Sequence, residues 1–88
     1  MRRVRVLVSG RVQGVFFRAS CAERVAALGL SGWIRNVANG DVEAVFEGTD
    51  AAVEQIVRWC REGPPLARVD RIDVVDESPT NESGFRVD

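Results

Sequence analysis

The chain has 88 residues, of which 45% are hydrophobic and 28% are charged, a balance typical of one small globular domain covering residues 1–88. No apolar run approaches the roughly 20 residues that cross a bilayer, and no leader peptide opens the chain, so we expect a cytoplasmic protein without membrane contact. Histidine, lysine and tyrosine are absent. Their absence excludes catalytic triads, phosphohistidine intermediates, histidine metal sites, Schiff bases and a Walker lysine.

Charge is distributed unevenly along the chain. Residues 1–36 carry seven arginines and one acid, a formal charge of +6, whereas residues 37–88 carry five arginines and twelve acids, a formal charge of −7. An anionic ligand is therefore expected to meet the N-terminal part. The alternative is that the two parts neutralise each other across the folded surface. The charge distribution alone does not distinguish between these two interpretations.

The first elements are predicted to be a strand and a helix. Valine recurs at every second position through residues 4–8, which is typical of a strand with one buried face, and this strand is expected to end near Ser9. Residues 10–17 have the composition of a loop. A helix is predicted from Arg18 to Gly29, a favoured residue just past a helix end, with an apolar stripe formed by Cys21, Val25 and Leu28.

Two strands and a second helix follow. Residues 33–38 and 41–47 alternate or are β-branched, and the Asn39-Gly40 pair between them is a strong hairpin signal because both residues tolerate positive φ. Thr49 or Asp50 can cap the second helix, whose apolar stripe is Val53, Ile56, Val57 and Cys60.

The chain closes with a strand at about 67–75 and a short strand at 85–87, after Gly63-Pro64-Pro65 ends the helix. The order β-α-β-β-α-β with one extra strand predicts an α+β, ferredoxin-like split βαβ sandwich, with an antiparallel sheet and two helices on one face. In this topology the loop at 10–18 and Asn36 share one rim of the sheet.

The two cysteines are predicted to lie at the same end of the helical layer, since the helices must run antiparallel. A disulfide between Cys21 and Cys60 is conceivable, but both lie on apolar stripes, so buried reduced thiols are the preferred interpretation.

The strand-to-helix loop, Gly10 to Arg18, carries the strongest chemical signal. Helix starts present unpaired backbone N–H groups that bind phosphate, and Gly10 and Gly14 allow successive amides to point into one concavity. Arg18 opposes the helix macrodipole by ~0.3–1 kcal/mol, so its position is explained if an anion binds there. The alternative is an exposed arginine whose stem packs on Phe16 or Phe17.

Asn36 is the second candidate, near the end of a strand at the same rim. A carboxamide both donates and accepts hydrogen bonds, so it can orient a water molecule without acting as a base. A turn or cap role is the alternative for a lone asparagine at a strand end.

These residues resemble the acylphosphatase family. The first family pattern is an apolar residue, any residue, then Gly-x-Val-Gln-Gly-Val-x-Phe-Arg, and residues 8–18 match it throughout. The second pattern, Gly-aromatic-small apolar-basic-Asn-x3-Gly-x-Val-x5-Gly, matches residues 32–48 except that Ile34 is bulkier than usual. The likeness extends to residues 84–87, but the arginine and tyrosine at the end of many relatives are replaced here by an ending at Asp88.

The resemblance implies hydrolysis of small acyl phosphates to a carboxylate and inorganic phosphate, with no cofactor. It implies that Arg18 and Asn36 are catalytic, with Asn36 placing the attacking water. The phosphoryl group would be bound by Gln13, Gly14, Val15, Phe16, Phe17 and Arg18. A carboxylate leaving group needs no general acid. We expect no metal, since the aspartates at 70, 73 and 76 are interpreted as solvent-exposed charges.

Two further expectations concern partners, and one alternative concerns function. RNA binding is disfavoured because residues 41–47 carry three acids and one aromatic, where an RNA-recognition sheet carries basic and aromatic residues. A monomer is expected. The alternative function is a non-catalytic phosphate or anion-binding module of the same fold.

Overall fold

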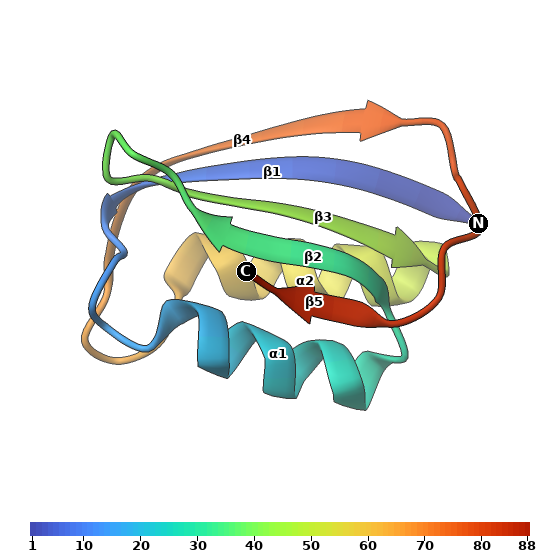
Figure 1. Cartoon of the computed structure of the whole chain (residues 1–88), viewed down its shortest axis with the longest axis horizontal. Helices are drawn as coiled ribbons and strands as arrows, with labels where there is room; N and C mark the ends of the chain where they lie inside the picture. The colour runs from blue at the N-terminus through green and yellow to red at the C-terminus, as the bar shows by residue number, and fades with distance from the viewer.

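The computed structural model describes all 88 residues as one sheet with two helices packed on a single face (Figure 1). None of the helices is long and apolar enough to cross a bilayer. The elements in chain order are β1 (Arg2–Arg11), α1 (Phe17–Leu28), β2 (Ser31–Asn36), β3 (Val42–Gly48), α2 (Asp50–Glu62), β4 (Arg68–Glu77) and β5 (Phe85–Val87).

The strand order across the sheet is β4-β1-β3-β2-β5. β3 lies between β1 and β2 and is antiparallel to both, and β4 is antiparallel to β1, which confirms the ferredoxin-like α+β class. β5 pairs in parallel with β2, so the sheet is mixed at this edge. The parallel pairing arises because residues 78–84 carry the chain from one edge of the sheet to the other.

The core lies between the sheet and the two helices. In the middle of β1 and β3, alternate residues point toward the helices and are removed from water: Val4, Val6, Val8, Val42, Ala44 and Phe46. Each valine or phenylalanine among them contributes about 1.5–3 kcal/mol when fully buried. The sheet and the helices supply to this core, among others, Val4, Val6, Val8, Ala44, Phe46, Phe17, Val25, Val53 and Ile56.

Both cysteines belong to this core and are free thiols. A hydrogen bond with Cys21 and burial raise the pKa of the Cys60 thiol well above its ordinary value. A protonated, buried thiol is a poor nucleophile. The cysteines therefore act as small apolar side chains at the interface of the helices.

The β2–β3 hairpin has a different turn from the expected one. Only Gly40 adopts positive φ, at 99°, whereas Asn39 does not. The Asn39 side-chain oxygen instead accepts a hydrogen bond from the N–H of Asp41, at 3.0 Å. The Val37 N–H donates to the Asp41 carbonyl, so the turn already begins at residue 37. The strand before it therefore ends at Asn36 and not at residue 38.

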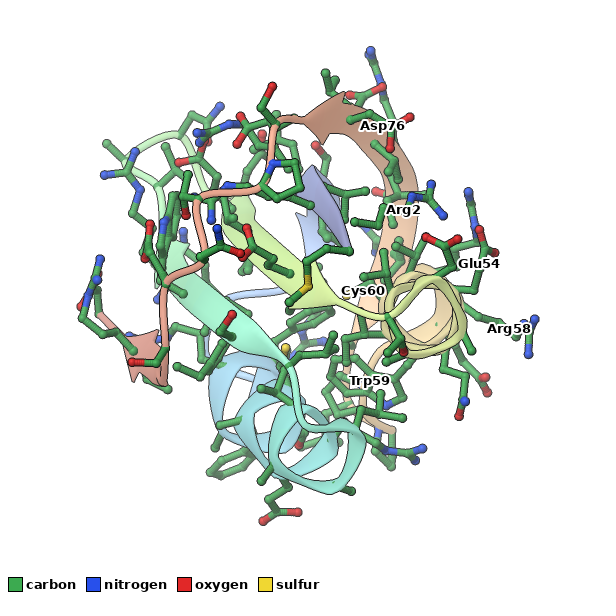
Figure 2. The ribbon with its side chains drawn as sticks, turned by 90° about the vertical axis from the view of Figure 1, so that its right-hand side faces the viewer. Arg2, Glu54, Arg58, Trp59, Cys60 and Asp76 are labelled. Carbon is green, nitrogen blue, oxygen red and sulfur yellow. The ribbon has the colours of Figure 1, made fainter.

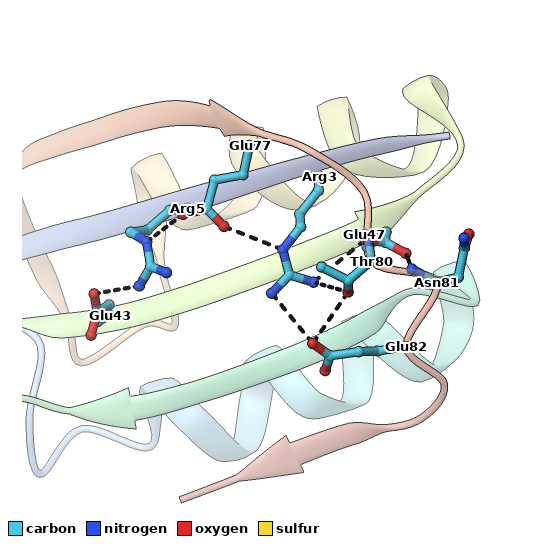
Figure 3. Close-up of polar contacts among 8 residues, drawn as sticks. All are labelled: Arg3, Arg5, Glu43, Glu47, Glu77, Thr80, Asn81 and Glu82. Atoms are coloured by element: carbon cyan, nitrogen blue, oxygen red, sulfur yellow. Dashed lines mark hydrogen bonds and ion pairs between the residues drawn. The ribbon is translucent and has the colours of Figure 1, made fainter.

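A buried ion pair holds the crossover between β4 and β5 to the far end of the sheet (Figure 3). The Glu47 carboxylate accepts hydrogen bonds from the N–H groups of Thr80 and Asn81, at 2.8 and 2.9 Å. Arg3 lies 3.4 Å from Glu47 and also contacts Glu77, at 3.2 Å. The crossover, which has no secondary structure of its own, is thereby fixed in place.

Two acids also hold the start of β1 in place. Figure 2 shows Arg2 between Glu54 of α2 and Asp76 of β4, with which it makes ion pairs of 2.7 and 3.2 Å. These groups are more exposed than Arg3 and Glu47, so solvent screens them more strongly.

Candidate active site

The loop between β1 and α1 reverses direction through two residues with left-handed backbone. Gly14 has φ 73° and Phe16 has φ 66°. A Cβ at Gly14 would meet nothing within 4 Å, so glycine is favoured there by its φ and not by lack of space. Gly10 serves a different purpose, because it lies at a bulge where a Cβ would come within 2.2 Å of the Arg68 carbonyl oxygen.

The backbone N–H groups of residues 14–19 donate to no acceptor within the protein. The first internal hydrogen bond of the helix runs from the Ser20 N–H to the Phe16 carbonyl, at 3.0 Å. Phe16 provides no side-chain cap, and the first turn of α1 holds no acidic residue. The helix start therefore presents free donors and a partial positive charge, an arrangement that binds oxyanions.

Arg18 lies in the first turn of α1, beside these donors. Its guanidinium forms no ion pair with a side-chain carboxylate and donates from Nη1 to the main-chain oxygen of Asp88, at 2.5 Å. Asp88 is brought there by β5, since its N–H donates to the Ile34 carbonyl at 2.9 Å. The contact occupies Nη1 alone, and Nε and Nη2 make no hydrogen bond within the protein, so these two donors are free for an anion that enters the loop.

Asn36 is the last residue of β2 and pairs with Val42 of β3. It is on the same face of the strand as buried Ile34, which is the face that the helices cover. The side chain is exposed and makes no hydrogen bond within the protein. Its carboxamide is free to bind a water molecule or a ligand.

These groups surround one hollow of about 250 Å³. The predicted residues Gly14, Phe16, Phe17, Arg18 and Asn36 line it together, whereas Gln13 and Val15 do not. In Figure 1 the β1–α1 loop and the end of β2 lie at the same end of the molecule, opposite the N-terminus. Two lining residues were missed by sequence reasoning, Val12 and Ala19, whose small apolar side chains carry no chemical signal.

Gln13 connects the loop to the hairpin. Its Nε2 donates to the carbonyl oxygens of Val37 and Asp41, at 2.8 and 3.0 Å. These bonds fix the loop relative to the residues that follow Asn36. This tie was also missed from the sequence, since its acceptors are main-chain atoms in a turn 24 residues further along.

A larger hollow, of about 590 Å³, lies between the helices and the segment 63–67. It contains neither Arg18 nor Asn36, and its two acids, Glu23 and Glu62, outnumber its one base, Arg24, so its charge does not favour an anion. Size therefore does not identify the site.

The acidic residues of β4 are each paired with an arginine. Arg68 lies 2.9 Å from Asp70, Arg71 lies 3.1 Å from Asp73, and Arg2 bonds Asp76. No group of three or more histidine, cysteine, aspartate or glutamate side chains is close enough to share a metal ion.

Fold and site together define a class, an α+β domain of the ferredoxin-like type whose strand-to-helix loop presents free backbone N–H groups beside an arginine. The acylphosphatase family model matches residues 4–87. An acylphosphatase of Rubrobacter xylanophilus is 59% identical over 87 residues, which cover 98% of this chain and 79% of that protein. The chain therefore belongs to the acylphosphatase family, and its function is that of an acylphosphatase, a hydrolase.

Solved structures agree with this assignment. The chain resembles an acylphosphatase from Bacillus subtilis with a TM-score of 0.95 and 33% identity, covering 99% of this chain and 98% of the other. It resembles an acylphosphatase from Coxiella burnetii with a TM-score of 0.94 and 39% identity, covering 99% of this chain and 92% of the other.

Proposed function

We propose that the hollow binds the phosphoryl group of a small acyl phosphate and hydrolyses its carboxyl–phosphate bond, releasing a carboxylate and inorganic phosphate. The observation that carries this proposal is the meeting of Arg18, Asn36 and the free N–H groups of residues 14–19 at one rim. In phosphoryl transfer an enzyme mainly positions the reactants and stabilises charge on the equatorial oxygens, so few side chains are needed.

Arg18 and the loop amides hold the phosphoryl oxygens. The free N–H groups of residues 14–19 supply dipoles, and the planar guanidinium supplies a full charge and parallel donors. Because charge spreads over these oxygens as the bond to the leaving group breaks, donors already in place lower the barrier without reorganising.

Asn36 orients the attacking water through its carboxamide. Among the lining residues only Arg18 is ionisable, so the hollow offers no side-chain base. The water's proton therefore passes to an oxygen of the substrate's own phosphoryl group. The bond that forms joins the water oxygen to phosphorus, and the electron pair of the breaking bond leaves on the carboxylate.

No metal ion or cofactor takes part in the proposed reaction. A carboxylate leaving group has a conjugate-acid pKa of about 4, so it departs without protonation. The alkoxide of an ordinary phosphate monoester would need an acid or a metal that the hollow does not supply, so monoesters should be poor substrates.

The protein acts as a single domain, residues 1–88, and as a monomer in the cytoplasm. One chain provides all residues of the hollow, and two buried free thiols suit a reducing compartment. Nucleic acid is not a partner, because Arg5 and Arg35 on the helix-free face of the sheet are already paired with acids. Arg5 lies 2.9 Å from Glu43 and 2.7 Å from Glu77, and Arg35 lies 2.7 Å from Glu43.

The test is release of free phosphate from benzoyl phosphate and acetyl phosphate in excess chelator, with p-nitrophenyl phosphate as the monoester control. Turnover of both acyl phosphates, little turnover of the monoester and no requirement for an enzymic group of pKa about 6–8 in the pH–rate profile are expected. Inhibition by inorganic phosphate without any turnover would instead identify a non-catalytic anion-binding module.

A further inference from the structure

Phe16 combines two unfavourable features at the rim of the hollow. The residue is 72% exposed, so it forgoes most of the stabilisation that burial of a phenyl group provides. Its backbone is left-handed, with φ 66° and ψ 24°, a region that aromatic residues rarely adopt. Costs of this kind persist where a residue serves a function.

The loop does not need the Phe16 ring for its own packing. The neighbouring Phe17 already anchors the loop in the core, where it is 2% exposed and its ring centroid lies 5.1 Å from that of Trp59. The Phe16 ring stacks on no other aromatic side chain and on no arginine. Glycine would adopt the same φ without strain, so the backbone of the cradle does not require phenylalanine either.

The position of Phe16 suits contact with the substrate. It is the only strongly exposed large hydrophobic residue that lines the hollow with Arg18 and Asn36, since Met1, Leu66, Val75 and Val87 lie outside it. In an acyl phosphate the acyl carbon is joined to phosphorus through a single oxygen. When the loop binds the phosphoryl end, the acyl group therefore lies at the same rim of the hollow as this ring.

We infer that the Phe16 side chain is the contact for the acyl group and gives the enzyme a preference for acyl phosphates with aromatic or large apolar acyl groups. This inference rests on the proposed function and adds the substrate class. Stacking of the ring on a benzoyl group buries apolar surface of both, whereas an acetyl group offers one methyl. The contact is made equally in the ground state and the transition state, so it acts mainly on KM.

The test compares benzoyl phosphate with acetyl phosphate in the wild type, Phe16→Ala, Phe16→Leu and a matched control, Val75→Ala, which truncates an exposed apolar residue outside the hollow. In Phe16→Ala the ratio of kcat/KM for benzoyl over acetyl phosphate should fall about three- to tenfold, through a higher KM for benzoyl phosphate. Phe16→Leu should keep part of the preference, and Val75→Ala all of it.

The inhibition constant of inorganic phosphate separates an acyl contact from a general effect on the loop. If Phe16 acts on the acyl group, this constant should change by less than about twofold in Phe16→Ala. An unchanged substrate ratio, or equal losses for both substrates together with weaker phosphate inhibition, would overturn the inference while leaving the proposed function intact. A wild type that hydrolyses neither substrate would overturn both.

Discussion

The two ends of the sheet carry the same kinds of group, an arginine and backbone N–H donors, but only one end pairs them with a carboxylate. At the N-terminal end, Arg3 and the N–H groups of Thr80 and Asn81 converge on the carboxylate of Glu47, which is 1% exposed (Figure 3). At the other end, Arg18 and residues with free backbone N–H groups, among them Gly14 and Ala19, line a hollow that has no acidic side chain. We propose that both ends are anion sites, of which only the first is filled by the protein's own side chain.

This difference separates stability from function. An anion site that the chain fills itself fixes a crossover and rigidifies the fold. An anion site left open gains nothing for the folded state, and Arg18 even opposes the helix dipole there. Substitutions at the open end should therefore change catalysis with little effect on folding, and substitutions at the filled end should do the reverse.

Arg18→Ala should give the largest effect. Loss of the only charged donor in the hollow is expected to lower kcat/KM for acyl phosphates by about 10³-fold and to weaken inhibition by phosphate. The melting temperature should change by less than about 5 °C, because the contact with the Asp88 main-chain oxygen is exposed. Arg24→Ala, on the same helix but outside the hollow, is the control and should keep near-native rates. Near-native rates in Arg18→Ala would contradict the role of this residue.

Asn36→Ala should divide binding from turnover. The carboxamide is proposed to place water and not to hold the phosphoryl group, so kcat should fall by about 10²-fold while the phosphate inhibition constant stays the same. Steady-state kinetics with benzoyl phosphate, with phosphate as the inhibitor, measure both quantities. If phosphate affinity fell in step with kcat, Asn36 would be a phosphate ligand instead.

Glu47→Gln tests the filled end. The substitution leaves Arg3 buried with one carboxylate fewer, and breaking a buried pair is far more costly than breaking an exposed one. We expect the melting temperature to fall by about 10–20 °C, with unchanged kcat/KM at a temperature where the variant is folded. The control is Glu54→Gln, whose pair with Arg2 is shorter, at 2.7 Å, but exposed, and whose melting temperature should barely change. Equal losses in the two variants would show that the buried network is not special.

The open end was predictable from the sequence to a greater extent than the filled end. Glycines, an arginine and an asparagine at fixed spacing marked the loop and the strand end, and the ferredoxin-like order placed both at one rim. No sequence pattern predicts the Glu47 network, because its donors include main-chain groups of a crossover 33 residues away. The bonds from Gln13 to the hairpin were not predicted for the same reason. The direction of β5 was not predicted either, because it depends on the path of residues 78–84 across the sheet.

Acid should weaken the filled end and leave the open end unaffected. The hydrogen bond from the Thr80 N–H, then the Asn81 N–H and Arg3, lower the pKa of Glu47 below its ordinary value. Hydrogen bonds from Arg5 and then Arg3 likewise lower the pKa of Glu77. A carboxylate whose pKa is lower in the folded state stabilises the fold fully above the unfolded value of about 4.3, and this contribution is lost as the pH falls through the folded value.

The melting temperature of the wild type should therefore decline below about pH 4.5, and that of Glu47→Gln should decline less steeply, because one of the responsible carboxylates is gone. Thermal unfolding followed by circular dichroism from pH 7 to pH 2.5 measures both curves. Arg18→Ala should follow the wild-type curve, since no carboxylate side chain pairs with Arg18. Parallel curves for the wild type and Glu47→Gln would mean that Glu47 titrates alike in the folded and unfolded chains, and the division between a filled and an open anion site would then fail at its filled end.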